Sequence, residues 1–284
     1  MTNISIRGVS LFVKVLGHGY PLALMHGGPG ADHHSMLPLR PCADQFTLVF
    51  YDHRCNGRSE GAAVSSMTWE NLTADAEALR EKLGFETWAV LGHSFGGMVA
   101  LEYAVRYPEC LSHLLLLDTC GDTWWVRRNA AEVLAKRGFP RETVETARRF
   151  FTGRITPEEF MPSIRTLARA YYHNPSPLRM AREILTVGIR TKVRPEAQIF
   201  AFGDLLEGWT VMDRLSEIQV PTLVLAGRDD FQFPPEHQAE LASGIPDAHL
   251  KIVDRAGHNA HSERSVVVSE YIKRFLATAD AERA

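Results

Sequence analysis

The sequence lacks any long hydrophobic run, any excess of basic residues and any closely spaced pair of cysteines. Its longest apolar stretches, such as residues 114–117 and 222–226, are far shorter than the roughly 20 residues that a membrane-spanning helix needs. Lys and Arg number 31 against 34 Asp and Glu, for a net charge of −3, whereas proteins that bind nucleic acid through its phosphates usually carry a basic excess. We therefore expect neither a membrane protein nor a nucleic-acid-binding protein.

The four cysteines form no C-x-x-C pair, and in a chain of 284 residues we interpret them as free thiols in a reducing compartment. The N-terminus has no basic start followed by an apolar block, the pattern of a secretory signal. These two features predict a cytoplasmic protein. Hydrophobic residues make up 45% and charged residues 23%, which excludes a disordered chain and is typical of a globular one.

Short apolar runs alternate with longer amphipathic stretches over the first 120 residues. An N-terminal hairpin of two edge strands is predicted around Gly8, because apolar and polar residues alternate on both sides of it. Further strands are predicted at residues 21–25, 46–51, 88–91 and 114–117, and helices at residues 68–83 and 98–107. Near-continuous apolar strands separated by helices indicate a parallel sheet that is covered on both faces.

This alternation stops at residue 121 and resumes after residue 212. The intervening stretch predicts helices only, at residues 123–137, 141–151, 157–172 and 178–187. Beyond it the pattern predicts strands at residues 222–226 and 249–253 and helices at residues 235–243 and 265–276. We therefore predict one α/β domain, formed by residues 1–120 and 213–284, that is interrupted by a helical cap at residues 121–212.

The sequence GHSFG at residues 92–96 matches the G-x-S-x-G motif, and it stands between a predicted strand and a predicted helix. In that context the serine occupies a sharp, strained turn, where the Cβ atoms of larger neighbours would clash. The flanking glycines fit this requirement. The motif predicts that Ser94 is a catalytic nucleophile.

A serine hydroxyl is a weak nucleophile that needs a base, which is itself oriented by a carboxylate. In this strand–turn–helix context the acid and then the histidine follow the serine along the chain. His258 lies in a loop beyond the strand at residues 249–253 and is the predicted base, with His261 as the alternative. The acid is expected just past residues 222–226, where Asp229 and Asp230 compete because neighbouring residues on an extended segment face opposite ways.

The attacked carbonyl develops negative charge, which preorganised hydrogen-bond donors must stabilise. The backbone N–H of Phe95, the residue after the serine, is one predicted donor, and the glycine-rich loop HGGPG at residues 26–30 is the predicted source of the second. The adjacent pair His33 and His34 has no convergent partners in the sequence, so we interpret it as part of a loop. We predict neither a metal site nor a cofactor.

With these residues in place, the chain resembles the proline iminopeptidase family of the α/β-hydrolase fold over nearly its whole length. HGGPG at residues 26–30 matches that family's oxyanion loop, which implies Gly28 as the second donor. DHRCNGRS at residues 52–59 resembles its D-Q-R-G-x-G-x-S loop, with departures at His53, Cys55 and Asn56. GRDD at residues 227–230 resembles its G-x-x-D acid loop, and this spacing selects Asp230. The resemblance implies a mostly parallel eight-stranded sheet with a helical cap inserted after the sixth strand.

An N-terminal exopeptidase must neutralise the ammonium of its substrate, and in this family glutamates near the cap do so. Glu196 and Glu207, together with Asp204, are the candidates here. The cap is also rich in large aromatic side chains, some of which are expected to form the roof of the pocket. Trp124 and Trp209 are the predicted substrate-binding residues among them. The remaining aromatic residues are Trp125, Phe150, Phe151, Phe160, Tyr171 and Tyr172. A neutral ester, lactone or acyl amide would suit such a roof as well as a prolyl residue.

The sequence therefore predicts a serine hydrolase that acts on a small-molecule or short-peptide substrate through an acyl-enzyme. A proline iminopeptidase-type aminopeptidase is the leading interpretation, and a carboxylesterase or lactonase with a small apolar acyl substrate is the alternative. A ligand-binding protein that uses a hydrolase pocket without catalysis is a more remote alternative, which an intact Ser94–Asp230–His258 set disfavours.

Overall fold

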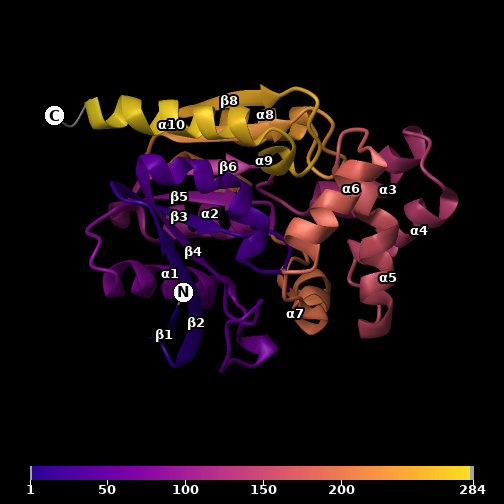
Figure 1. The fold of residues 1–284 in the computed structure, drawn as a ribbon, viewed down its shortest axis with the longest axis horizontal. Helices are drawn as coiled ribbons and strands as arrows, with labels where there is room; N and C mark the ends of the chain where they lie inside the picture. Colours follow the sequence, from indigo (N-terminus) through magenta and orange to yellow (C-terminus); the bar gives the residue numbers. More distant parts are fainter. Residues whose placement is uncertain (1, 282–284) are drawn as a thin grey trace.

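An eight-stranded sheet forms the centre of the computed structural model, which describes residues 2–281 (Figure 1). The strands are β1 Thr2–Ile6, β2 Val9–Leu16, β3 Tyr20–Met25, β4 Phe46–Tyr51, β5 Trp88–His93, β6 Leu111–Leu117, β7 Thr222–Gly227 and β8 Ala248–Val253. Their order in the sheet is β1-β2-β4-β3-β5-β6-β7-β8, and β3 to β8 run parallel. The predicted mostly parallel sheet of eight strands is confirmed.

The N-terminal hairpin differs from the prediction in one respect. β1 lies at the edge of the sheet, but β2 pairs with β1 on one side and with β4 on the other, antiparallel to both. β2 is therefore an inner strand. Its alternating pattern is typical of a half-buried strand at any place in a sheet, so the pattern alone could not distinguish an edge from an inner position.

Helices cover both faces of the sheet, because successive side chains of a buried strand point to opposite sides. Leu22 and Leu24 of β3 pack with the 3-10 helix η1 (His33–Asp44), with α9 (Ala260–Glu263) and with α10 (Ser265–Ala281). Ala23 and Met25 face the other side, which α1 (Trp69–Lys82), α2 (Phe95–Arg106) and α8 (Pro235–Gly244) cover. Both apolar faces of the sheet are thus buried.

The helices between β6 and β7, here called the cap, gather at one end of the sheet (right in Figure 1). They are α3 Trp124–Lys136, α4 Arg141–Phe150, α5 Pro157–Leu167, α6 Pro177–Glu183 and α7 Pro195–Phe200, with shorter 3-10 and π turns between them. The chain enters and leaves the cap side by side, since the N–H of Val211 donates to the carbonyl of Gly121 at 2.8 Å. None of the helices in the described part of the chain has the length and apolarity of a membrane-spanning segment.

Candidate active site

Three side chains from the carboxyl ends of three parallel strands meet at one edge of the sheet. Ser94 lies between β5 and α2, Asp230 follows β7, and His258 follows β8. The Ser94 Oγ is 3.0 Å from Nε2 of His258, and Nδ1 of the same ring is 2.8 Å from Oδ2 of Asp230. All three side chains are buried. Since a carboxylate only accepts, Nδ1–H donates to Asp230 and Nε2 is left to accept the Ser94 proton.

Ser94 adopts a backbone conformation that residues other than glycine rarely take, with φ 53° and ψ −121°. Two glycines make room for it. A Cβ atom added to Gly92 would lie 2.3 Å from the carbonyl oxygen of Gly96, and one added to Gly96 would lie 2.1 Å from the carbonyl oxygen of Met25. The strained turn holds the hydroxyl of Ser94 clear of both β5 and α2, facing His258.

The two adjacent aspartates point in different directions. Oδ1 of Asp230 accepts a hydrogen bond from the backbone N–H of Gln232 at 2.8 Å, while Oδ2 faces His258. Asp229 is 38% exposed, and its Oδ2 lies 2.7 Å from Nδ1 of His173 in the cap. The structure therefore brings Asp230, and not Asp229, to His258.

His261 lies apart from Ser94 and has a different partner. Its Nε2–H donates to the backbone carbonyl of Ser35 at 2.8 Å, and burial lowers the pKa of its imidazole to about 4. The structure thus brings His258, and not its alternative, to the serine.

The loop that carries His258 is held by two polar side chains, those of buried His93 and half-buried Glu263. His93 donates from Nε2–H to the carbonyl oxygen of His258 at 2.9 Å. Glu263 accepts from the N–H of Gly257 at 2.6 Å. Each contact fixes the backbone on one side of the imidazole, so the ring position does not depend on Asp230 alone.

Asp118, directly after β6, ties the acid loop to the histidine loop. Its Oδ1 accepts from the N–H of Gly227 at 2.7 Å and its Oδ2 from the N–H of Ala260 at 3.2 Å. Burial and the charge of nearby Asp230 raise the pKa of Asp118. Asp118 is not among the predicted site residues, although it stands just beyond a buried strand, as Asp230 does.

The glycine-rich loop after β3 packs directly on the serine. A Cβ atom added to Gly27 would lie 2.9 Å from Cβ of Ser94. Gly28 lies beside it with φ +63°, a conformation that glycine adopts without strain. Phe95 begins α2, and its N–H is therefore one of the first-turn donors for which a helix has no acceptor of its own.

Residues of the DHRCNGRS loop support the glycine-rich loop from behind. Asn56 Oδ1 accepts a hydrogen bond from the N–H of Gly30, and the N–H of His53 donates to Nε2 of His26 at 3.2 Å. Asn56 and His53 are two of the departures from the family pattern. In this chain both lie in the support of the glycine-rich loop.

The pair His33 and His34 is built into loop contacts. Nδ1 of His33 is 2.7 Å from Oδ1 of Asp52, and His34 shares the Asp32 carboxylate with the guanidinium of Arg58. Both residues begin the 3-10 helix η1, so their interpretation as loop residues without convergent partners is wrong: each imidazole has a carboxylate partner.

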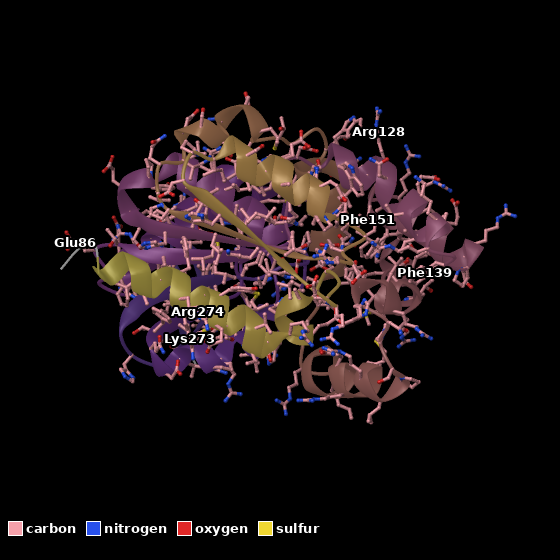
Figure 2. All side chains as sticks on the ribbon, turned by 90° about the horizontal axis from the view of Figure 1, so that it is seen from above. Glu86, Arg128, Phe139, Phe151, Lys273 and Arg274 are labelled. Carbon is pink, nitrogen blue, oxygen red and sulfur yellow. The ribbon has the colours of Figure 1, made fainter. Side chains whose placement is uncertain are left out.

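A cavity of about 350 Å³ opens beside Ser94, His258 and Gly28. The cap supplies its roof, which is mostly apolar: Phe150, Phe151, Phe160, Met161, Ile164, Met180, Ile184, Val193 and Phe202 line it, with Tyr171 and Tyr172. In Figure 2 the labelled Phe151 lies where the cap meets the core, and its ring centroid is 5.9 Å from that of Phe231 in the acid loop. A ligand in this cavity would contact the serine on one side and apolar cap side chains on the other.

The two tryptophans predicted to bind substrate lie outside this cavity, so their placement corrects the prediction. Trp124 is 56% exposed and its ring packs under the guanidinium of Arg128. Trp209 is buried, but its Nε1–H donates to Glu102 at 2.8 Å and its ring packs against Trp69. Trp209 joins the cap to the core instead of facing the serine.

The two glutamates predicted to bind an ammonium group also lie outside the cavity. Glu196 is an exposed residue in the first turn of α7. The Glu207 side chain is 70% exposed and lies 3.9 Å from the guanidinium of Arg127. Which face of a cap helix turns toward the serine is decided by packing between distant segments, and helical spacing alone does not reveal it.

The comparisons with known proteins agree with this fold. A family model described as alpha/beta hydrolase fold matches residues 20–265. The chain is 26% identical over 281 residues to the proline iminopeptidase PfmaB of Pestalotiopsis fici, covering 96% of this chain and 98% of that protein. It is 26% identical over 269 residues to the putative carbamate hydrolase RutD of Agrobacterium fabrum, covering 92% and 94%.

Among solved structures, the proline iminopeptidase of Mycobacterium smegmatis superposes with a TM-score of 0.78 at 24% identity, covering 99% of each chain. At this level of identity the likeness shows a shared fold. The chain belongs to the alpha/beta hydrolase fold family, and it is a hydrolase that resembles the proline iminopeptidases.

Proposed function

We propose that this protein is a serine hydrolase that cleaves an ester or amide bond through an acyl-enzyme on Ser94. The observation that carries the proposal is the unbroken hydrogen-bond chain from Ser94 through His258 to Asp230, which starts at the wall of an apolar cavity. Nucleophile, base and orienting acid in this arrangement are what acyl transfer requires.

In the first half of the reaction, Nε2 of His258 takes the Ser94 proton while Oγ attacks the substrate carbonyl. Asp230 accepts from Nδ1–H and stabilises the imidazolium that forms. The N–H groups of Gly28 and Phe95 donate to the oxyanion, and the imidazolium then gives its proton to the leaving alkoxide or amine. In the second half, His258 takes a proton from water, hydroxide attacks the acyl carbon, and Ser94 regains its proton as the acid product leaves.

The cavity favours a substrate with a neutral acyl group, such as an ester, a lactone or an acyl amide. Among the described residues that line it, Glu183 is the one with a carboxylate, and that carboxylate accepts a hydrogen bond from Ser262. Apolar side chains form most of the remaining wall. An apolar acyl chain is stabilised there by burial, whereas a free ammonium group would have to give up water for a single carboxylate.

A proline iminopeptidase-type aminopeptidase is the second candidate, and two observations favour it. PfmaB, which is named a proline iminopeptidase, aligns with 96% of this chain. Glu183 also faces the cavity from α6 and would be the partner of a substrate ammonium group.

The test of the proposed chemistry is a reaction with a fluorophosphonate, followed by mapping of the labelled peptide, with Ser94→Ala as the matched control. We expect one adduct, on Ser94, together with loss of hydrolysis of acyl p-nitrophenyl esters and prolyl arylamides. Ser94→Ala should take up no label. An adduct on another serine, or turnover that survives in Ser94→Ala, would overturn the proposal.

The two substrate candidates are separated by a prolyl arylamide with a free or an acetylated amine. A neutral acyl pocket hydrolyses the acetylated compound at least as well as the free amine. An aminopeptidase loses turnover on acetylation and on replacement Glu183→Gln, because the ion pair with the ammonium group is removed.

We also propose a reducing, cytoplasmic location. All four cysteines lie in the described part of the chain and are free thiols, and Cys42, Cys55 and Cys120 are buried among apolar side chains. Disulfides are the common state of paired cysteines in oxidising compartments.

A further inference from the structure

Two glutamines stand out in the wall of the apolar cavity. Gln198 is 2% exposed, and both Nε2 and Oε1 of its carboxamide are buried without a hydrogen-bond partner in the described part of the chain. Gln232 is 4% exposed, and its Nε2 is likewise buried without a partner. A buried carboxamide that bonds to no protein group is destabilising, unless whatever fills the cavity pairs with it.

The protein backbone holds both glutamines close to the reacting groups. The N–H of Arg194 donates to the carbonyl of Gly30 at 2.7 Å, and the backbone nitrogen of Gln198 lies 3.3 Å from where a Cβ on Gly30 would be. Gln198 therefore projects from a helix that is seated on the glycine-rich loop. Gln232 is fixed on the other side of the site, because its N–H donates to Asp230.

The chemistry of these groups indicates what they would bind. A carboxamide carries two N–H donors and one carbonyl acceptor but no charge. It pairs well with an uncharged group that has both a donor and an acceptor, and a secondary amide is the closest match. The rest of the wall is mainly apolar, so such a group would find few other partners there.

We propose that the substrate carries a second, uncharged amide-type group in its acyl part, and that Gln198 binds this group, with Gln232 as a further donor. The inference rests on the proposed serine hydrolase function and narrows its substrate class. Gln198 would be a specificity-determining residue, because it discriminates an amide-bearing acyl chain from a plain alkyl chain of the same length.

The test compares two esters of equal chain length, p-nitrophenyl 4-acetamidobutyrate and p-nitrophenyl heptanoate. We would measure kcat/KM for both with the wild-type protein and with Gln198→Met, which keeps the length of the side chain and removes its hydrogen bonding. Gln238→Met is the matched control, since Gln238 is also fully buried but lies in α8, outside the lining of the cavity.

With Gln198→Met we expect kcat/KM for the acetamido ester to fall by about 10- to 100-fold, because a buried amide loses its partner. The heptanoate kcat/KM should change less than about threefold, because its alkyl chain makes no hydrogen bond to Gln198 and only the packing around it changes. In Gln238→Met the ratio of the two values should stay as in the wild type. Equal losses for both esters, or no loss for either, would show that Gln198 does not bind the acyl chain.

A binding measurement keeps this inference separate from the proposed catalysis. Ser94→Ala, with and without Gln198→Met, would be titrated calorimetrically with methyl 4-acetamidobutyrate and methyl heptanoate. Tighter binding of the acetamido ester that depends on Gln198 supports the inference, whether or not the wild type shows turnover. Absence of turnover in the wild type would overturn only the proposed function. Turnover of both esters with no effect of Gln198 on either measurement overturns the inference and leaves the proposed function standing.

Discussion

At the scale of single residues, two adjacent aspartates have identical side chains but different environments, because the backbone points them in different directions. Asp230 is buried against His258, whereas Asp229 is partly exposed and contacts His173 in the cap. Arg137 binds the backbone of both, donating to the carbonyl of Asp229 at 2.6 Å and to that of Asp230 at 3.4 Å. The guanidinium helps to fix which of the two carboxylates faces inward.

We expect Asp230→Asn to lower kcat by about three to four orders of magnitude, because an amide does not stabilise the imidazolium and favours the wrong tautomer of His258. Asp229→Asn is the matched control and should leave kcat within a few-fold of the wild type. Steady-state kinetics with an acyl p-nitrophenyl ester provide the measurement. A comparable loss in Asp229→Asn would show that the acid is assigned to the wrong residue.

The sequence predicted the placement of Ser94 and His258 because each follows a strand of the parallel sheet, and parallel strands end at the same edge. The same argument placed the acid at Asp229 or Asp230, and the resemblance to the family's acid loop selected Asp230. The sequence did not predict the pocket wall, since the cap helices could turn any of several faces inward. Trp124 and Glu196, chosen by residue type, face away. Gln198 and Gln232 could have been noticed in the sequence, because each is a single polar residue between apolar neighbours, in AQIF and FQF.

At the scale of elements, the contact between α2 and β3 sets the shape of the serine turn. The first turn of α2 lies against the end of β3, where a Cβ on Gly96 would lie 2.1 Å from Met25 O. It also lies against the segment after β6, where a Cβ on Gly97 would lie 2.4 Å from Thr119 Oγ1. Ser94 directly precedes the first residue of α2, so any movement of this helix away from β3 would also move Ser94.

We therefore expect Gly96→Ala to destabilise the protein by about 3 kcal/mol or more, as overpacking against backbone atoms does, and to lower Tm by about 5–10 °C. Gly203→Ala is the matched control, because no atom lies within 4 Å of where its Cβ would be. Thermal unfolding of the two variants and the wild type gives the comparison. Equal Tm values for Gly96→Ala and the wild type would mean that the helix and strand are less tightly packed than described.

The elements of the core were predictable because their strands are nearly continuous apolar runs and their helices have clear ends. α1, for example, begins after Thr68, which accepts a hydrogen bond from the N–H of Asn71, and ends before Gly84 with φ +78°. Several short elements were missed, η1 and α7 among them. η1 contains Pro38 and Pro41, which break the helical pattern, and α7 is a short helix whose place depends on the core loop beneath it.

At the scale of the whole molecule, the core keeps several histidines uncharged. Burial lowers the pKa values of His26, His53, His93 and His261, the last to about 4. In the unfolded chain each imidazole titrates near 6.5. Between these pH values the unfolded state binds more protons than the folded state, so stability falls as the pH is lowered through 6.5 and is lost progressively toward 4.

From pH 7 to pH 5, His261 alone should account for about 2 kcal/mol of lost unfolding free energy. We expect His261→Gln to lose that much less stability than the wild type over the same interval, in urea titrations at the two pH values. The raised pKa of Asp118 acts in the opposite direction, but it is common to both proteins and cancels in the comparison. His249→Gln, at an exposed position, is the control, and an unchanged pH dependence in His261→Gln would contradict the assignment.

The hydrogen bond between Val211 and Gly121, together with the antiparallel bridge between Asp122 and Thr210, has a consequence for how this architecture diversifies. The chain passes from the core into the cap and back through one narrow stem, whose two segments are paired with each other. A different helical insert, longer or shorter, can be joined at that stem without altering the register of β6 and β7. Chimeras that exchange everything above the stem would therefore inherit the catalytic residues of one parent and the acyl selectivity of the other.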